Sequence, residues 1–178
     1  MKKILLTIAV CLCVSGLASA QDWSVGGRVG SGLQAVGQYH GFGDVAGKPF
    51  YLEGRFGMSW CNPGASLMAD FTALAAWNCF EFGNYNAGNF FADFGAGISV
   101  GGREHYAYVG VAGLAKIGFK FSGAPVSLSF DWTPAFGPEI AYYGKQTIQG
   151  VTIPGASASD FFEYGLANFG ITLSLIHI

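Results

Sequence analysis

The chain has 178 residues, of which 51% are apolar, 16% aromatic and 11% charged, and its formal net charge is −2. A near-neutral chain offers no basic stripe for nucleic acid, so we expect no nucleic-acid partner. After residue 20, no run of about 18 apolar residues could form a membrane-spanning helix, so the apolar groups must either fill a core or face lipid as strands.

The first 20 residues have the form of a secretory signal. Residues 1–3 read Met-Lys-Lys, residues 4–17 are mostly apolar, and residues 18–20 read Ala-Ser-Ala, the small-x-small pattern of a cleavage site. A transmembrane anchor is the alternative, but the apolar stretch is too short to span a bilayer. We therefore expect cleavage after Ala20 and a mature chain that begins at Gln21.

Large apolar residues alternate with small or polar residues through most of the mature chain. Residues 50–60 show this well, because FYLEGRFGMSW places Glu53 and Arg55 on one side and Phe56 and Met58 on the other. A period of two residues is typical of a β-strand. The alternation predicts eight strands, over residues 23–29, 33–40, 50–60, 66–78, 90–100, 107–121, 126–133 and 161–172, of which the last is the least regular.

The two faces of these strands indicate which side meets water. The polar face consists mostly of Gly, Ser, Thr and Gln, which is a poor outer surface for a soluble barrel. The apolar face is an unbroken set of aliphatic and aromatic residues, as expected for strands that face lipid. We therefore predict an all-β fold, a transmembrane eight-stranded antiparallel up-and-down β-barrel that encloses its polar face. The aromatic residues near strand ends are expected to form a girdle at the lipid headgroups: Trp23, Tyr39, Trp60, Trp77 and Trp132.

Ionised residues on the enclosed face are balanced, with four of each sign. An unpaired buried charge costs several kcal/mol, so we expect a mutually neutralising network whose pairs the sequence does not assign. An eight-stranded barrel has room for side chains and little more, so the lumen should be packed. The expected interior network comprises Arg28, Glu53, Arg55, Asp70, Asp93, Lys116, Lys120 and Asp131.

The connections between the strands follow from their alternating direction. We expect inner turns at 41–48, 83–88 and 122–125, and outer connections at 30–32, 61–65 and 101–104. Residues 137–160 are then a long fourth outer loop. The two cysteines of the mature chain, Cys61 and Cys79, would lie at opposite ends of a strand, so we expect no disulfide between them.

Three segments, YLEGRFG, KIGFKFSGAPVSLSFDW and TPAFG, resemble strand and turn segments of small porin-like outer-membrane barrels of Gram-negative bacteria, the OmpA- and OmpX-type barrels. The resemblance covers essentially the whole mature chain, and residues 131–134 match an end-of-strand element common in that family. It implies a location in the bacterial outer membrane, with outer-membrane lipid and lipopolysaccharide as partners. It also implies insertion by the barrel-assembly machinery.

The end of the chain departs from that family, whose members usually finish on an aromatic residue. Residues 173–178 read LSLIHI, which is also the translation of one frame of a common transposase sequencing adapter. We hypothesise that the native barrel covers residues 21–172 and that the last six residues are adapter read-through. Both the absent terminal aromatic residue and an expected failure of the strand alternation there motivate this hypothesis.

Residues that could support catalysis or bind a metal or cofactor are sparse. His105 follows Glu104 on the expected outer rim, but no serine motif accompanies it, so a solvated histidine is favoured over the Ser/His/acid cluster of a lipid A-modifying enzyme. No Cys/His spacing indicates zinc, the acidic residues are too scattered for calcium, and no glycine pair precedes a helix, so we expect no metal, cofactor or nucleotide.

The favoured function is therefore a non-enzymatic outer-membrane protein with a structural or surface-interaction role. Its contact surface would be the loop at 137–160. A narrow porin-like conduit for small solutes and a lipid A-modifying barrel enzyme are the two alternatives. The sequence does not name an extracellular ligand.

Overall fold

The computed structural model describes residues 22–60, 67–103, 106–148, 151–163 and 169–176. Within these ranges the chain is all β. Its strands are β1 (Trp23–Gly30), β2 (Gly32–Tyr39), β3 (Asp44–Val45), β4 (Lys48–Trp60), β5 (Leu67–Tyr85), β6 (Gly88–Arg103), β7 (Tyr106–Phe121), β8 (Val126–Trp132), β9 (Ala135–Ile148), β10 (Val151–Glu163) and β11 (Phe169–Ile176).

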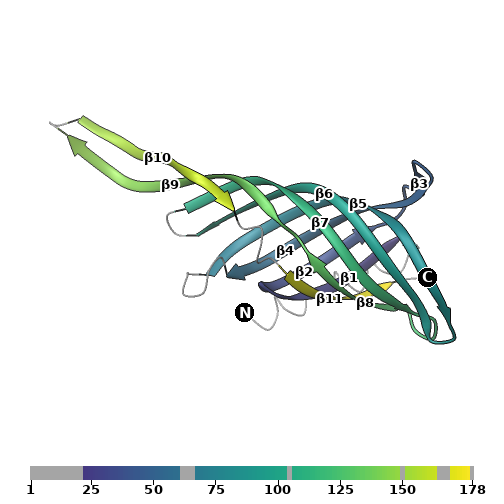
Figure 1. The fold of residues 1–178 in the computed structure, drawn as a ribbon. Coiled ribbons are helices and arrows are strands. Elements are labelled where there is room, and N and C mark those ends of the chain that lie inside the picture. The colour runs from purple at the N-terminus through teal and green to yellow at the C-terminus, as the bar shows by residue number, and fades with distance from the viewer. Residues whose placement is uncertain (1–21, 61–66, 104–105, 149–150, 164–168, 177–178) are drawn as a thin grey trace.

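Eight of these strands close into an antiparallel barrel (Figure 1). The order around the barrel is β1, β2, β4, β5, β6, β7, β8 and β11, and β11 pairs with β1 to complete the circle. Arg28 of β1 lies opposite Thr172 of β11, which lies opposite Ser129 of β8, so the first and last strands are joined in a fixed register. The predicted eight-stranded antiparallel barrel is confirmed as an architecture.

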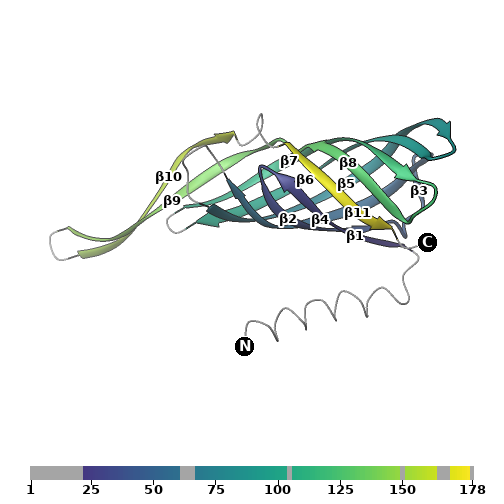
Figure 2. The same ribbon diagram turned by 90° about the horizontal axis from the view of Figure 1, so that it is seen from below.

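The two ends of the barrel differ. One end, which we call the turn end, carries the connections after β2, β5 and β7, including the short hairpin in which β3 pairs with the start of β4. The opposite end, which we call the hairpin end, carries β9 and β10, which extend beyond the barrel wall (Figure 2). The strand β11 runs toward the turn end, far from the tip of that hairpin (Figure 1).

Residues 137–160, expected as a loop, form most of a β-hairpin instead. β9 continues the path of β8 after Thr133 and Pro134 and keeps pairing with β7, from Ala135 opposite Ala112 to Ala141 opposite Tyr106. β10 then pairs with β9 along its length. Pro134 cannot donate a backbone hydrogen bond, so the ladder is interrupted there, although its carbonyl oxygen still accepts from Gly113 N at 2.7 Å.

The last strand also differs from expectation. We expected the alternation to fail after Thr172, yet Leu173 and Leu175 are exposed whereas Ser174 between them is buried. These residues pair with both neighbours, because Leu173 lies opposite Gly27 of β1 and Leu128 of β8. The prediction that the alternation fails there was therefore wrong. The read-through hypothesis stays a prediction that now rests on the match to the adapter translation and on the missing terminal aromatic residue.

The barrel is polar inside and apolar outside. Arg28 and Asp131 are fully buried, whereas Phe56 is 65% and Val111 is 64% exposed on the outer face. A soluble protein buries its apolar side chains and exposes its charges, so this arrangement is the reverse of a soluble core. Six of the buried apolar residues form one cluster: Tyr51, Leu74, Ala76, Ala112, Leu114 and Ala135.

Candidate functional site

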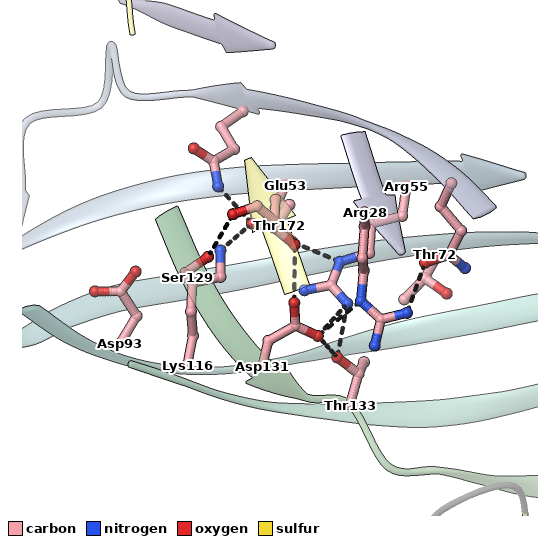
Figure 3. A network of polar contacts seen from close by, with 12 residues as sticks. Arg28, Glu53, Arg55, Thr72, Asp93, Lys116, Ser129, Asp131, Thr133 and Thr172 are labelled. Carbon is pink, nitrogen blue, oxygen red and sulfur yellow. Dashed lines mark hydrogen bonds and ion pairs between the residues drawn. The ribbon is translucent and has the colours of Figure 1, made fainter. Parts of the chain in front are cut away.

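Five of the predicted interior charges form one connected group, which we call the interior network (Figure 3). They come from four strands that are distant in sequence, and each lies on the inward face because of the period of two along its strand. The interior network comprises Arg28 of β1, Glu53 and Arg55 of β4, Lys116 of β7 and Asp131 of β8.

Asp131 joins the two arginines. Its Oδ1 accepts from Arg28 Nε at 2.8 Å and from Arg55 Nη1 at 3.1 Å. Its Oδ2 accepts from the Thr172 hydroxyl at 2.9 Å. The Thr133 hydroxyl, which accepts from Arg55 Nη1 at 2.7 Å, donates to Asp131 Oδ1 at 3.2 Å. This carboxylate therefore has donors on both oxygens, as a buried charge requires.

Glu53 joins Arg55 to the lysine. Its Oε1 accepts from Arg55 Nε at 2.5 Å, and its Oε2 accepts from Lys116 Nζ at 2.5 Å and from Gln38 Nε2 at 2.6 Å. The charges consequently alternate in sign across the lumen, from Arg28 through Asp131, Arg55 and Glu53 to Lys116.

Two further predicted residues attach to this network through neutral side chains. Gln34 accepts from Arg28 Nη1 at 3.1 Å and donates to the Asp70 carboxylate. Tyr51 accepts from Lys116 Nζ at 3.2 Å and donates to Asp93 Oδ2 at 2.6 Å. Asp70 and Asp93 are therefore inside the barrel, as predicted, and are joined to the network by an amide and a phenol.

Lys120 is the exception among the eight predicted interior charges. Its side chain is 48% exposed, and its ammonium pairs at 3.4 Å with Glu81, which is equally exposed. The residue lies one position before the end of β7, where the wall opens to solvent at the turn end. Lys120 therefore faces the interior at its mouth, as its place in the alternation predicts, but it does not belong to the buried network, because alternation determines the face of a strand and not the depth of a side chain.

Neutral partners of the network were not predicted as site residues. They are Gln34, Gln38, Tyr51, Thr133 and Thr172. All five lie on the polar side of the alternation, so the same signal that selected the charged residues could have selected them. Their role as bridges could not be predicted, because it depends on which strands become neighbours when the barrel closes.

The interior network is almost inaccessible to solvent. Arg28, Arg55, Glu53 and Asp131 are each at most 1% exposed. A water-sized probe therefore hardly reaches these side chains. The arrangement ties four strands together across the barrel interior.

His40, the one histidine among the described residues, does not activate the serine beside it. The Ser24 hydroxyl donates to Gln38 Oε1 at 2.6 Å, and His40 Nε2 lies 3.4 Å from the same hydroxyl. The serine proton is thus directed to the amide and not to the imidazole, unlike in an activated nucleophile. His105 lies outside the described residues, so the rim constellation remains untested.

The predicted girdle residues that can be described lie on the outer face or at the rim. Trp23 packs against Tyr39 with ring centroids 4.9 Å apart, and Trp77 packs against Phe50 at 5.0 Å. These pairs lie toward the turn end. Trp132 stacks on Phe169 at 6.3 Å, where β8 and β11 meet. The Trp60 side chain lies outside the described part of the chain. Contact with lipid headgroups remains a prediction for all five.

The described residues also bear on the expectations for metal ligands, spanning helices and cysteines. Within the described ranges, no group of three metal-ligating side chains is present, and no helix is long and apolar enough to cross a membrane. Cys79 is a free thiol, and Cys61 lies outside the described residues.

Comparisons of the chain with protein-family models, with curated proteins and with solved structures find no match. The resemblance to OmpA- and OmpX-type barrels therefore stays a prediction that rests on the strand and turn segments.

Proposed function

We propose that this protein is a non-enzymatic outer-membrane β-barrel with a closed lumen, which holds the β9–β10 hairpin outside the membrane as a contact surface. The observation that supports insertion is the reversal of polarity between the two faces of the wall. Large apolar side chains such as Phe56, Ile98 and Val111 are more than half exposed, whereas the interior network is buried. Water is a poor solvent for such an outer face, but the hydrocarbon of a bilayer is a good one.

A pair of matched substitutions tests insertion. Val111 lies near the middle of β7, whereas Val45 is an exposed valine in β3 at the turn end. An arginine on the lipid face of a membrane barrel costs about 2 to 4 kcal/mol at the bilayer midplane and about 0 to 1 kcal/mol near its surface. In phosphatidylcholine vesicles, we expect Val111→Arg to lower the free energy of unfolding by the larger amount and Val45→Arg by the smaller. Equal and small effects would contradict insertion.

The β9–β10 hairpin supports the surface-interaction role. Within the described chain, β10 pairs only with β9, so its other edge is available for an additional strand. An open edge of this kind binds an extended peptide segment through main-chain hydrogen bonds. We propose that this edge, and not an irregular loop, is the contact surface.

Shortening the hairpin tests whether it is separate from the barrel. Tyr142 lies opposite Ala156, so residues 143–155 can be replaced by Asn-Gly, which forms a two-residue hairpin turn. We expect unchanged folding in vesicles, because those of the removed residues that the structure describes pair only within the hairpin. In intact cells, a cysteine placed at the wild-type tip should react with a membrane-impermeant maleimide. A fold that fails after shortening, or a tip protected in intact cells, would contradict a displayed hairpin.

The two alternative functions have separate tests. A conduit requires a passage through the barrel, but the buried interior network crosses the barrel interior, so we expect no conductance steps in planar bilayers. A lipid A-modifying enzyme would change the mass of lipid A when the protein is expressed. Conductance steps would favour the conduit over the proposed role, and a changed mass of lipid A would favour the enzyme.

A further inference from the structure

A cavity of about 260 Å³ lies inside the barrel at the turn end, next to the interior network. We call it the mouth cavity. The residues that face it from the rim, such as Trp23 and Lys120, are exposed, whereas Asp93, Ser127 and Ser129 are buried. One water needs about 10 to 15 Å³ of such a cavity, so this volume accommodates a small organic molecule. The mouth cavity is therefore open to solvent and has a buried polar floor.

One side chain on this floor lacks a hydrogen-bond donor. Asp93 is 4% exposed, and its Oδ2 accepts from the Tyr51 hydroxyl. Its Oδ1 is buried and has no hydrogen-bond partner within the described chain. Figure 3 shows Asp93 apart from the dashed contacts of the interior network. Because a buried carboxylate oxygen without a donor is costly, a donor in the mouth cavity would satisfy the Asp93 carboxylate once this side chain turns toward the cavity.

The charges around the mouth cavity disfavour an ionic ligand. Lys116 and Lys120 both line it, and each lies within 6 Å of an aromatic ring centroid, at 5.3 Å for Tyr51 and 5.9 Å for Phe91. These two ammonium groups are balanced by the carboxylates of Asp93 and Glu81, so the lining as a whole attracts neither a cation nor an anion. A neutral molecule that donates hydrogen bonds fits such a lining without leaving a charge uncompensated.

The remaining lining residues suit a ligand with several hydroxyl groups. The Ser127 and Ser129 hydroxyls donate and accept, and the ring of Phe91 offers apolar surface. We propose that the mouth cavity binds an uncharged polyhydroxylated molecule of monosaccharide size, with one hydroxyl group donating to the Asp93 carboxylate. This binding role is additional to the hairpin and does not depend on it.

Saturation-transfer difference NMR with glucose as the probe tests the proposal. The purified chain is folded in amine-oxide detergent, because a detergent with a sugar headgroup would compete. Putrescine and inorganic phosphate serve as cationic and anionic probes. We expect a signal for glucose and none for the two ions. Asp93→Ala should weaken glucose binding by at least about tenfold, since it removes a charged acceptor. Asp70→Ala is the matched control, because Asp70 is a buried carboxylate that does not line the mouth cavity.

A second variant guards against loss of folding in Asp93→Ala. Ser127→Leu keeps the carboxylate and fills part of the mouth cavity, so it should also abolish the glucose signal. Heat-modifiability on gels identifies which variants are folded. The proposal is overturned if folded wild-type protein gives no glucose signal, if an ion binds in place of glucose, or if folded Asp93→Ala and Asp70→Ala bind glucose equally.

Discussion

Removing Asp131 should destabilise the barrel more than removing any exposed carboxylate. Asp131→Ala leaves Arg28 without the carboxylate at 2.8 Å and Arg55 without the one at 3.1 Å, while both guanidinium groups stay buried. Removing one partner of a buried ion pair costs about 3 to 5 kcal/mol, because the remaining charge is left uncompensated. Arg55 keeps Glu53 at 2.5 Å, which limits the loss to this range even though two arginines are affected.

The assay is urea-induced unfolding in phosphatidylcholine vesicles, followed by tryptophan fluorescence. The control is Glu81→Ala, since Glu81 pairs with Lys120 across 3.4 Å and both side chains are about half exposed. An exposed pair of this kind contributes about 0 to 1 kcal/mol. A third variant replaces Arg28 and Asp131 together by methionine and leucine. It should be less destabilised than Asp131→Ala, because it leaves one buried cation fewer without a partner.

Comparable losses for Asp131→Ala and Glu81→Ala would refute this reasoning, because they would mean that water reaches the interior network. A double variant at least as unstable as Asp131→Ala would also count against it. In that case the cost would come from lost packing and not from uncompensated charge.

Two further predictions concern backbone contact and pH. A Cβ on Gly97 would lie 1.8 Å from Ala73 O, whereas one on Gly54 would meet nothing within 4 Å. Gly97→Ala should therefore lower the free energy of unfolding by more than about 1 kcal/mol, and Gly54→Ala should leave it nearly unchanged. The same urea titration measures both. Partial burial of the His40 ring and nearby Lys120 lower the pKa of His40, so the folded protein binds fewer protons than the unfolded chain, and stability should fall as pH drops below about 6.5. His40→Gln should reduce this dependence, and an identical pH profile for the variant would contradict it.

The barrel and its polar interior could be predicted because they depend on local alternation. Seven of the eight predicted strands match barrel strands, and their period of two places Arg28, Glu53 and Asp131 on the same side of the wall without any knowledge of the pairing. The eighth, expected at residues 161–172, was misplaced, because residues 161–163 belong to β10 and the last barrel strand is Phe169–Ile176. The ion pairs could not be predicted in this way. Arg28 meets Asp131 across 103 positions of sequence, and the meeting depends on the register in which β11 joins β1 to β8.

The β9–β10 hairpin was missed because its sequence contains turn signals. Gly137, Pro138, Pro154 and Gly155 suggest loops when they are considered locally. In the structure, Pro154 falls at a register shift between Ile153 and Gly155, where a bulge accommodates a residue that cannot join the ladder. Pairing with an existing edge thus overrode the local preference, an effect that only the closed barrel reveals.

A single irregularity in β5 shows how closely the two faces of the wall are linked. Up to Trp77 the outward residues of β5 are odd-numbered, including Phe71, but beyond it they are Phe80 and Phe82, which are 61% and 48% exposed. The register shifts between Asn78 and Phe80, so one extra residue reverses the parity of the strand. Without this shift, both phenylalanines would point into the mouth cavity and the carboxylate of Glu81 would point outward. The bulge therefore keeps the apolar side chains on the outer face and supplies Lys120 with its partner Glu81. A single extra residue thus preserves the polar interior and apolar exterior that the alternation sets along the rest of the strand.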